Sequence, residues 1–194
     1  MKRIYYILNT FRTFPVWIMI KLMDLEAIIK EDMNGYFYLF DNKNLNDFMM
    51  FNRIISKKKL FCNIVNYRIK SKNKTASYIA KVFLHEKKDF EISQGVIGGG
   101  LTVFHGHGTT IVCEKAGVNL NVYQGVTIGK NQRNGSIKDA PVLGDNVTIY
   151  TNAVVAGPIH IGNNVKIGAG AVVMKDVPDN TTVIGNPCIF KHNK

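Results

Sequence analysis

A pattern that repeats every six residues between residues 143 and 177 constrains the fold more than any other feature of this sequence. Aliphatic residues recur at this step, and a second small or aliphatic residue follows each of them four places later. The first set is Leu143, Ile149, Val155, Ile161, Ile167 and Val173. An α-helix needs apolar residues every three or four places, and a half-buried strand needs them every second place. A step of six fits neither, so the sequence predicts short strands joined by corners.

Six-residue units of this kind are typical of a parallel β-helix. The branched aliphatic side chain points inward, and Gly and Asn supply the backbone angles that a tight corner requires. Three units make one triangular coil of roughly 18 residues. The same step extends back to Ile97, with a one-residue shift near Gly108–Thr110 and a polar stretch at Lys130–Ala140. We expect the shift to lie at a corner and the polar stretch to leave the coil as a loop.

The first part of the chain follows a different pattern, with few glycines and many Leu, Ile, Phe, Met and Lys at helical spacing. The predicted helices are Val16–Met33, Leu45–Lys57, Leu60–Lys70 and Ser77–His85. The sequence therefore predicts a mainly β protein of two parts: an N-terminal α-helical domain at residues 1–88 and a parallel β-helix domain with a C-terminal tail at residues 89–194.

The charge of the chain is concentrated in its first half. The formal net charge is +11; residues 1–92 hold 17 Lys and Arg against 9 Asp and Glu, and the rest hold 8 against 5. Such an excess suggests nucleic acid or an anionic small molecule as a partner. No nucleic-acid-binding motif accompanies it, and scattered lysines usually form a solvated helix face. We therefore expect no nucleic-acid partner.

Cysteine usage and the N-terminus bear on the compartment. Cys62, Cys113 and Cys188 form neither a CxxC pair nor an even framework, which favours a reducing environment. Cys113 lies among aliphatic residues and is expected in the core. The apolar run Phe14–Ile20 has no small-residue cleavage site and is too short to span a bilayer. The prediction is a cytoplasmic protein without an integral membrane segment, and a loose contact with a membrane surface stays open.

Two histidines, His105 and His107, interrupt the repeat between glycines. Corners of a β-helix normally hold corner and core residues, so two imidazoles there are unusual. The ordinary interpretation is a pair of exposed corner side chains. The functional interpretation is a general base, because a neutral imidazole can accept a hydroxyl proton near neutral pH. Gln124 follows about one coil later and should lie beside His105.

Four segments together resemble the hexapeptide-repeat acyltransferases, specifically the serine acetyltransferases and their surface-polysaccharide O-acetyltransferase relatives. They are 105–108 (His-Gly-His-Gly), 123–129 (Tyr-Gln-Gly-Val-Thr-Ile-Gly), 167–178 and 185–187 (Gly-Asn-Pro), and the match covers about residues 90–190. The resemblance implies a left-handed parallel β-helix, an assembly as a homotrimer or a dimer of trimers with active sites between subunits, and acetyl-CoA as the acetyl donor. It implies no metal.

The resemblance also implies roles for individual residues. His105 corresponds to the catalytic histidine and Glu91 to the acidic residue that orients it, with Asp89 in reserve because Glu91 is one residue out of step. The implied coenzyme-binding positions are Gly129, Thr151, Gly168, Ala169 and Lys175, of which the lysine would meet a phosphate. The candidate acceptor-binding residues are His107, Gln124 and Asp139.

The acceptor follows from a departure from the serine acetyltransferase pattern. Those enzymes carry a basic Arg-His pair before a proline, which suits the carboxylate of an amino acid. Here Asp139 and Ala140 stand at that place, and a like charge disfavours a carboxylate. Phe104 adds an apolar wall. We therefore expect a saccharide hydroxyl as the acceptor, with serine O-acetylation in cysteine biosynthesis as the alternative, for which Lys138 or Arg133 could supply the positive charge.

Two further alternatives come from other functional classes. A zinc hydrolyase on the same solenoid would use His105, His107 and His160, but two of these imidazoles are only two residues apart on one coil, a poor arrangement for converging on one ion. A non-catalytic scaffold or sugar-binding solenoid would use the β-helix without chemistry, and release of thiol from acetyl-CoA would exclude it.

Overall fold

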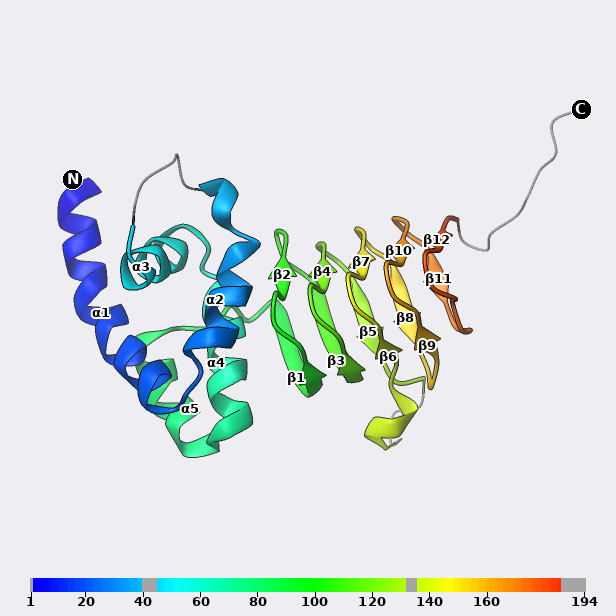
Figure 1. Cartoon of the computed structure of the whole chain (residues 1–194), viewed down its shortest axis with the longest axis horizontal. Helices are drawn as coiled ribbons and strands as arrows, with labels where there is room; N and C mark the ends of the chain where they lie inside the picture. Colours follow the sequence, from blue (N-terminus) through cyan, green and yellow to red (C-terminus); the bar gives the residue numbers. More distant parts are fainter. Residues whose placement is uncertain (1, 40–44, 132–135, 186–194) are drawn as a thin grey trace, which may run out of the picture. The chain divides into compact units, whose positions relative to one another are not determined.

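The computed structural model describes residues 2–39, 45–131 and 136–185 (Figure 1). Arg133, Cys188 and the last two residues of the 185–187 motif lie outside these ranges. The chain separates into two compact units, Met1–Lys88 and Asp89–Lys194. Each unit has its own secondary structure and its own core.

Helices build the described part of the N-terminal unit. They are α1 (Lys2–Leu22), α2 (Glu26–Asn34), the 3-10 helix η1 (Phe37–Leu39), α3 (Asp47–Lys57), α4 (Phe61–Lys72) and α5 (Lys74–Phe83). Side-chain caps start two of them, because Asn46 accepts a hydrogen bond from the Met49 N–H and Asn73 accepts one from the Ala76 N–H. In the core, Arg68 donates two hydrogen bonds to the carboxylate of Asp32, each 2.9 Å long.

The prediction of one helix over Val16–Met33 is wrong, because two helices share this segment. Helix α1 begins much earlier and ends at Leu22, and α2 begins at Glu26. Asp24 between them has φ +56°, in the left-handed region that a right-handed helix cannot include. The other three predicted helices correspond to α3, α4 and α5, with ends that differ by up to three residues.

The C-terminal unit is a parallel β-helix, as predicted. Its strands are β1 (Phe90–Ile97), β2 (Thr102–Val103), β3 (Thr109–Ala116), β4 (Asn121–Val122), β5 (Thr127–Gly129), β6 (Val142–Leu143), β7 (Thr148–Ile149), β8 (Val154–Ala156), β9 (His160–Ile161), β10 (Lys166–Ile167), β11 (Val172–Val173) and β12 (Thr182–Val183). All the pairings between these strands are parallel.

The strands line up in three faces along the solenoid (Figure 1). The first face joins the starts of β1 and β3 to β5, β8 and β11. The second joins the ends of β1 and β3 to β6 and β9. The third contains β2, β4, β7, β10 and β12. The repeating aliphatic residues of these strands fill the interior between the faces.

The strand register confirms the predicted coil length and the predicted loop. Paired residues are 18 positions apart between β7 and β10, β8 and β11, and β6 and β9. They are 19 apart between β2 and β4, and 27 apart between β4 and β7. The longer step arises because the polar stretch Lys130–Ala140, with the short 3-10 helix η2 (Ile137–Asp139), leaves the coil.

Asparagines form one series of corners. Asn119, Asn146, Asn164 and Asn180 all have φ between +55° and +59°. The amide of each donates to the side-chain oxygen of the next, at 2.9, 3.1 and 3.0 Å in chain order. We call these four residues the asparagine ladder. Asn tolerates the left-handed region because its short polar side chain can hydrogen-bond locally.

Candidate active site

Four of the predicted site residues occupy one corner of the solenoid on successive coils. The Phe104 N–H donates to the Val122 carbonyl at 2.8 Å, so the register of β2 and β4 continues past the strands. The Tyr150 N–H donates to the Ile167 carbonyl in the same way, at 2.9 Å. The Asn152 and Gly170 N–H groups donate to the Gln124 and Thr151 carbonyls, which aligns Gln124, Thr151 and Ala169. On the first coil the Gly125 N–H donates to the His107 carbonyl, so His107 lies opposite Gln124 and His105 lies in the turn just before it. We call the four residues His105, Gln124, Thr151 and Ala169 at this corner the corner row. Neighbouring strands are about 4.8 Å apart, so the row extends about 14 Å.

The backbone at His105 is strained. Its φ is +64°, which is uncommon for a residue other than glycine. The Gly106 N–H donates to the Phe104 carbonyl at 2.8 Å, which makes His105 the centre of a γ-turn, and its side chain is exposed. Two further bonds hold this turn: Gly108 N–H to the Asp89 carbonyl at 2.7 Å, and Gly125 N–H to the His107 carbonyl at 3.0 Å. Strained backbone of this kind concentrates at functional sites.

The two candidate carboxylates lie along the strand beside this turn. Asp89 precedes β1 and meets Gly108 through its backbone, and Glu91 pairs with Thr110 in β3. Both side chains are exposed. Across the described residues no hydrogen bond joins either carboxylate to His105. The choice between Glu91 and Asp89 therefore stays a prediction.

The other predicted coenzyme residues lie across the first face from the corner row. Gly129 ends β5 and pairs with Ala156 in β8, and the same register continues to Met174, directly before Lys175. A Cβ added at Gly129 would meet nothing within 4 Å, so a ligand can approach the backbone there. Lys175 is exposed. The predicted residues thus bracket the first face, with His105 at one edge and Lys175 at the other.

The three candidate acceptor-binding residues differ in position. Gln124 lies in the corner row, and its buried Oε1 atom has no hydrogen-bond partner among the described residues. An unpaired buried acceptor is costly, so a donor from a substrate would stabilise it. His107 is exposed two residues after His105. Asp139 is half-buried in η2, on the loop that leaves the coil after Gly129, and is not part of the corner row.

An aromatic stack beside the corner row went largely unrecognised in the sequence. The rings of Phe104 and Tyr123 have centroids 4.6 Å apart at 22°, and those of Tyr123 and Tyr150 are 5.1 Å apart at 36°. Each ring directly precedes a residue of the corner row. The predicted apolar wall at Phe104 therefore extends over three coils. In the sequence, the signal that could have predicted this stack was an aromatic residue directly before His105, Gln124 and Thr151.

Other chemistry is less well supported by the side-chain arrangement. Cys113 is fully buried, and burial raises the pKa of its thiol to about 12, so it is not a nucleophile near neutral pH. His160 lies in β9 on the second face, away from the corner of His105 and His107. No three His, Cys, Asp or Glu side chains of residues 2–39, 45–131 and 136–185 are grouped so as to hold a metal ion.

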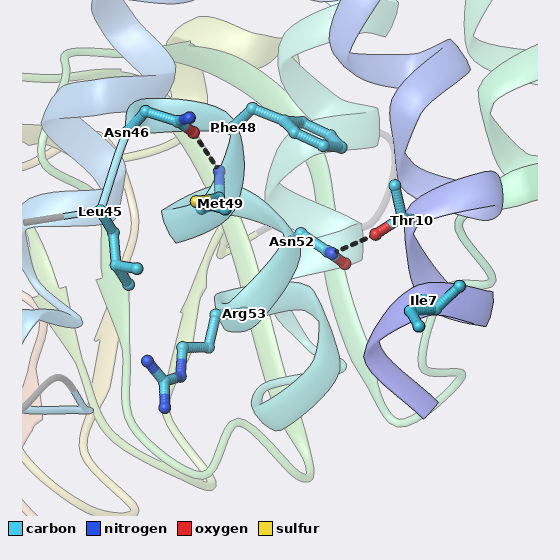
Figure 2. A pocket seen from close by; sticks show the side chains of 8 residues that line it. All are labelled: Ile7, Thr10, Leu45, Asn46, Phe48, Met49, Asn52 and Arg53. Carbon is cyan, nitrogen blue, oxygen red and sulfur yellow. Dashed lines mark hydrogen bonds between the residues drawn. The ribbon is translucent and has the colours of Figure 1, made fainter. Parts of the chain in front are cut away.

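A cavity of about 500 Å³ lies in the N-terminal unit (Figure 2). It is lined by Ile7, Thr10, Leu45, Asn46, Phe48, Met49, Asn52 and Arg53. These residues come from α1, from α3 and from the two residues before α3, and none is a predicted site residue. Within the described part of the chain, no helix combines the length and the apolar character needed to cross a membrane.

Comparisons with known proteins find the same repeat. Residues 140–175 match the family described as bacterial transferase hexapeptide (six repeats). A serine acetyltransferase of Bacillus pumilus is 45% identical over 93 residues, which are 47% of this chain and 42% of the relative. One of Bacillus licheniformis is 41% identical over 114 residues, 57% of this chain and 50% of the relative. The chain spans about half the length of the curated relatives it matches.

Solved structures extend the similarity to most of the chain. The serine acetyltransferase of Brucella abortus strain S19 is 26% identical with a TM-score of 0.66, over 88% of this chain and 70% of that one. The serine acetyltransferase of Neisseria gonorrhoeae is 28% identical with a TM-score of 0.63, over 83% of this chain and 63% of that one. These structures confirm the left-handed parallel β-helix with an N-terminal helical region. The β-helix of this chain is thus similar to bacterial hexapeptide transferases and to the β-helix of serine acetyltransferases.

Proposed function

We propose that the protein is an acetyl-CoA-dependent O-acetyltransferase and that L-serine is its acceptor. The observation that carries the proposal is the strained turn that presents His105 at one edge of the first face. The opposite edge offers an open backbone at Gly129 and a cation at Lys175. This arrangement suits a base at one end of a long, anionic donor.

The chemistry needs one proton carrier and no covalent enzyme intermediate, because the thioester is already activated. His105 accepts the proton of the acceptor hydroxyl while that oxygen forms a bond to the thioester carbonyl carbon. The bond from this carbon to sulfur then breaks, and the imidazolium returns the proton to the thiolate. Backbone groups around Thr151, Gly168 and Ala169 would hold the donor, and Lys175 would pair with a phosphate.

The choice of serine rests on the relatives, whose names support the serine alternative over the saccharide that the sequence favoured. The sequence argument depended on Asp139 as a negative charge beside the acceptor. Asp139 lies in the loop outside the corner row, so its repulsion of a carboxylate at His105 does not follow from the strand register.

A saccharide remains the second candidate because of the aromatic stack. Phe104, Tyr123 and Tyr150 form a half-buried wall beside the corner row. Aromatic rings bury large apolar areas, which suits the flat face of a ring-shaped acceptor. The unpaired Oε1 of Gln124 is an acceptor for a hydroxyl of either substrate.

Thiol release from acetyl-CoA tests the proposal. We expect a kcat/KM for L-serine of about 10⁴ M⁻¹s⁻¹ or above, the ordinary range for enzymes. A higher kcat/KM for any member of a saccharide panel would favour the second candidate. Absence of thiol release with every acceptor would refute both and favour the scaffold alternative. The His107→Ala variant is the matched control for His105→Ala, and its loss should be smaller.

The homotrimer, or pair of trimers, is part of the same proposal. In such an assembly each site would lie between two solenoids, so the exposed first face would be covered by a neighbour. Analytical ultracentrifugation at micromolar concentration should give a mass of three or six chains. A mass of one chain in an active preparation would contradict a site that needs two subunits.

A further inference from the structure

Helix α1 has an apolar face that the described chain leaves largely exposed, apart from an edge-on contact between the Phe14 and Phe48 rings. The exposed fractions are 54% at Ile7, 75% at Phe11, 50% at Phe14, 41% at Ile18 and 82% at Leu22. These residues are separated by four, three, four and four positions, so they lie in one line on a helix of 3.6 residues per turn. We call them the α1 stripe. At 1.5 Å per residue the stripe is about 22 Å long.

The opposite side of the same helix is already packed. Thr13, Val16 and Ile20 are fully buried, and Trp17 is 5% exposed. Helix α1 is thus apolar on two sides, and only one of them is needed for the core of the N-terminal unit. A helix that is apolar all round is normally buried. The stripe therefore indicates an apolar environment that contacts α1 from outside.

Charge distinguishes between the possible environments. Residues 1–88 contain 17 Lys and Arg and 7 Asp and Glu, so +10 of the net +11 belongs to the N-terminal unit. The sequence of α1 contains four Lys or Arg and no Asp or Glu. In two copies packed through the stripe, neither α1 would offer an acidic residue to the other, and Glu26, 3.8 Å from Lys21, would offset only one of the basic charges. An anionic lipid surface offers both apolar depth and negative charge.

We propose that the N-terminal unit binds the surface of anionic lipid bilayers through the α1 stripe. Helix α1 lies in the plane of the interface, with the stripe in the acyl boundary and Arg12 and Lys21 at the headgroups. The stripe is continuous with the cavity of Figure 2 through Ile7, and Met49, also 53% exposed, extends the apolar surface onto α3. The membrane surface is thus a second binding partner, distinct from the acetyl donor and acceptor.

Vesicle sedimentation with the full chain tests the proposal. The probes are vesicles of phosphatidylcholine alone and of phosphatidylcholine with phosphatidylglycerol. The test variant is Phe11→Gln/Leu22→Gln, which changes the two most exposed residues of the stripe and none of the packed face. The control is Val82→Gln, which removes a side chain that is 69% exposed from a different helix, α5.

We expect the parent and Val82→Gln to bind the anionic vesicles, and the double variant to bind at least about tenfold more weakly. Binding should also weaken on raising the salt from about 0.1 to 0.5 M, because screening reduces the headgroup attraction. Failure of the parent to bind anionic vesicles, or equal binding by the double variant, would overturn the proposal. So would an equal loss in Val82→Gln. A smaller solution mass of the double variant with unchanged vesicle binding would assign the stripe to contact between copies instead.

Discussion

The asparagine ladder predicts how two substitutions at one corner of the solenoid should differ. Asn146 has φ +57°, accepts a hydrogen bond from Asn119 at 2.9 Å and donates one to Asn164 at 3.1 Å. Each such bond contributes about 0.5–1.5 kcal/mol, so losing both costs about 1–3 kcal/mol. Alanine adds about 1–2 kcal/mol because its Cβ is unfavourable in the left-handed region. We expect Asn146→Ala to lower the free energy of unfolding by about 2–5 kcal/mol.

Asn146→Gly separates the two contributions. The glycine variant loses the same hydrogen bonds but avoids the steric cost of a Cβ. Part of this gain is offset because glycine gives the unfolded chain more conformational entropy. The net effect is that Asn146→Gly should be more stable than Asn146→Ala by about 1 kcal/mol. Asn152→Gly is the matched control, since Asn152 has φ +59° but lies outside the ladder. Urea denaturation followed by circular dichroism at fixed protein concentration measures the free energy of unfolding of the three variants Asn146→Ala, Asn146→Gly and Asn152→Gly. An Asn146→Ala variant at least as stable as Asn146→Gly would refute the backbone argument, and an Asn146→Gly variant as stable as Asn152→Gly would refute the ladder.

Three further predictions concern the site and the cores. His105→Ala should lower kcat at least about a hundredfold with an unchanged melting temperature, and full activity would remove His105 as the base. Burial raises the pKa of the Cys62 and Cys113 thiols to about 11 and 12, so a thiol reagent at pH 8 should label neither until the protein unfolds, in a variant whose third cysteine is serine. Because these pKa values are raised on folding, their contribution to stability is fully present below about pH 9 and is lost progressively as the pH rises toward about 11 and 12. Arg68→Met should lower the free energy of unfolding by about 3–5 kcal/mol because it removes two hydrogen bonds and the opposite charge from the buried Asp32 carboxylate, and a loss under about 1 kcal/mol in urea would contradict this.

The sequence by itself determined the class of fold and the chemistry of the corners. A step of six allows each aliphatic side chain one inward place on a three-sided coil, so the repeat from Leu143 to Val177 was enough to predict strands, corners and an 18-residue turn. Asn at the corners was predictable because few other residues adopt positive φ at low cost. His105 was a candidate for the base because two imidazoles interrupt a repeat whose corners otherwise hold corner and core residues.

Other features depended on how the coils stack. Thr151 and Ala169 align with Gln124 only because the loop at Lys130–Ala140 leaves the coil and lengthens one step to 27 residues. The chain does not mark where such a loop ends and where the register resumes. The strained turn at His105 is likewise held by one hydrogen bond to the Asp89 carbonyl and one from the Gly125 N–H, and both of these residues are distant in the sequence. The same limit explains the helix error at Asp24. Local sequence favoured a continuous apolar pattern, and the packing of α1 and α2 against α3 decided that the backbone turns there. Periodicity is a property of neighbours along the chain, whereas register and strain are set by contacts between segments that the sequence separates.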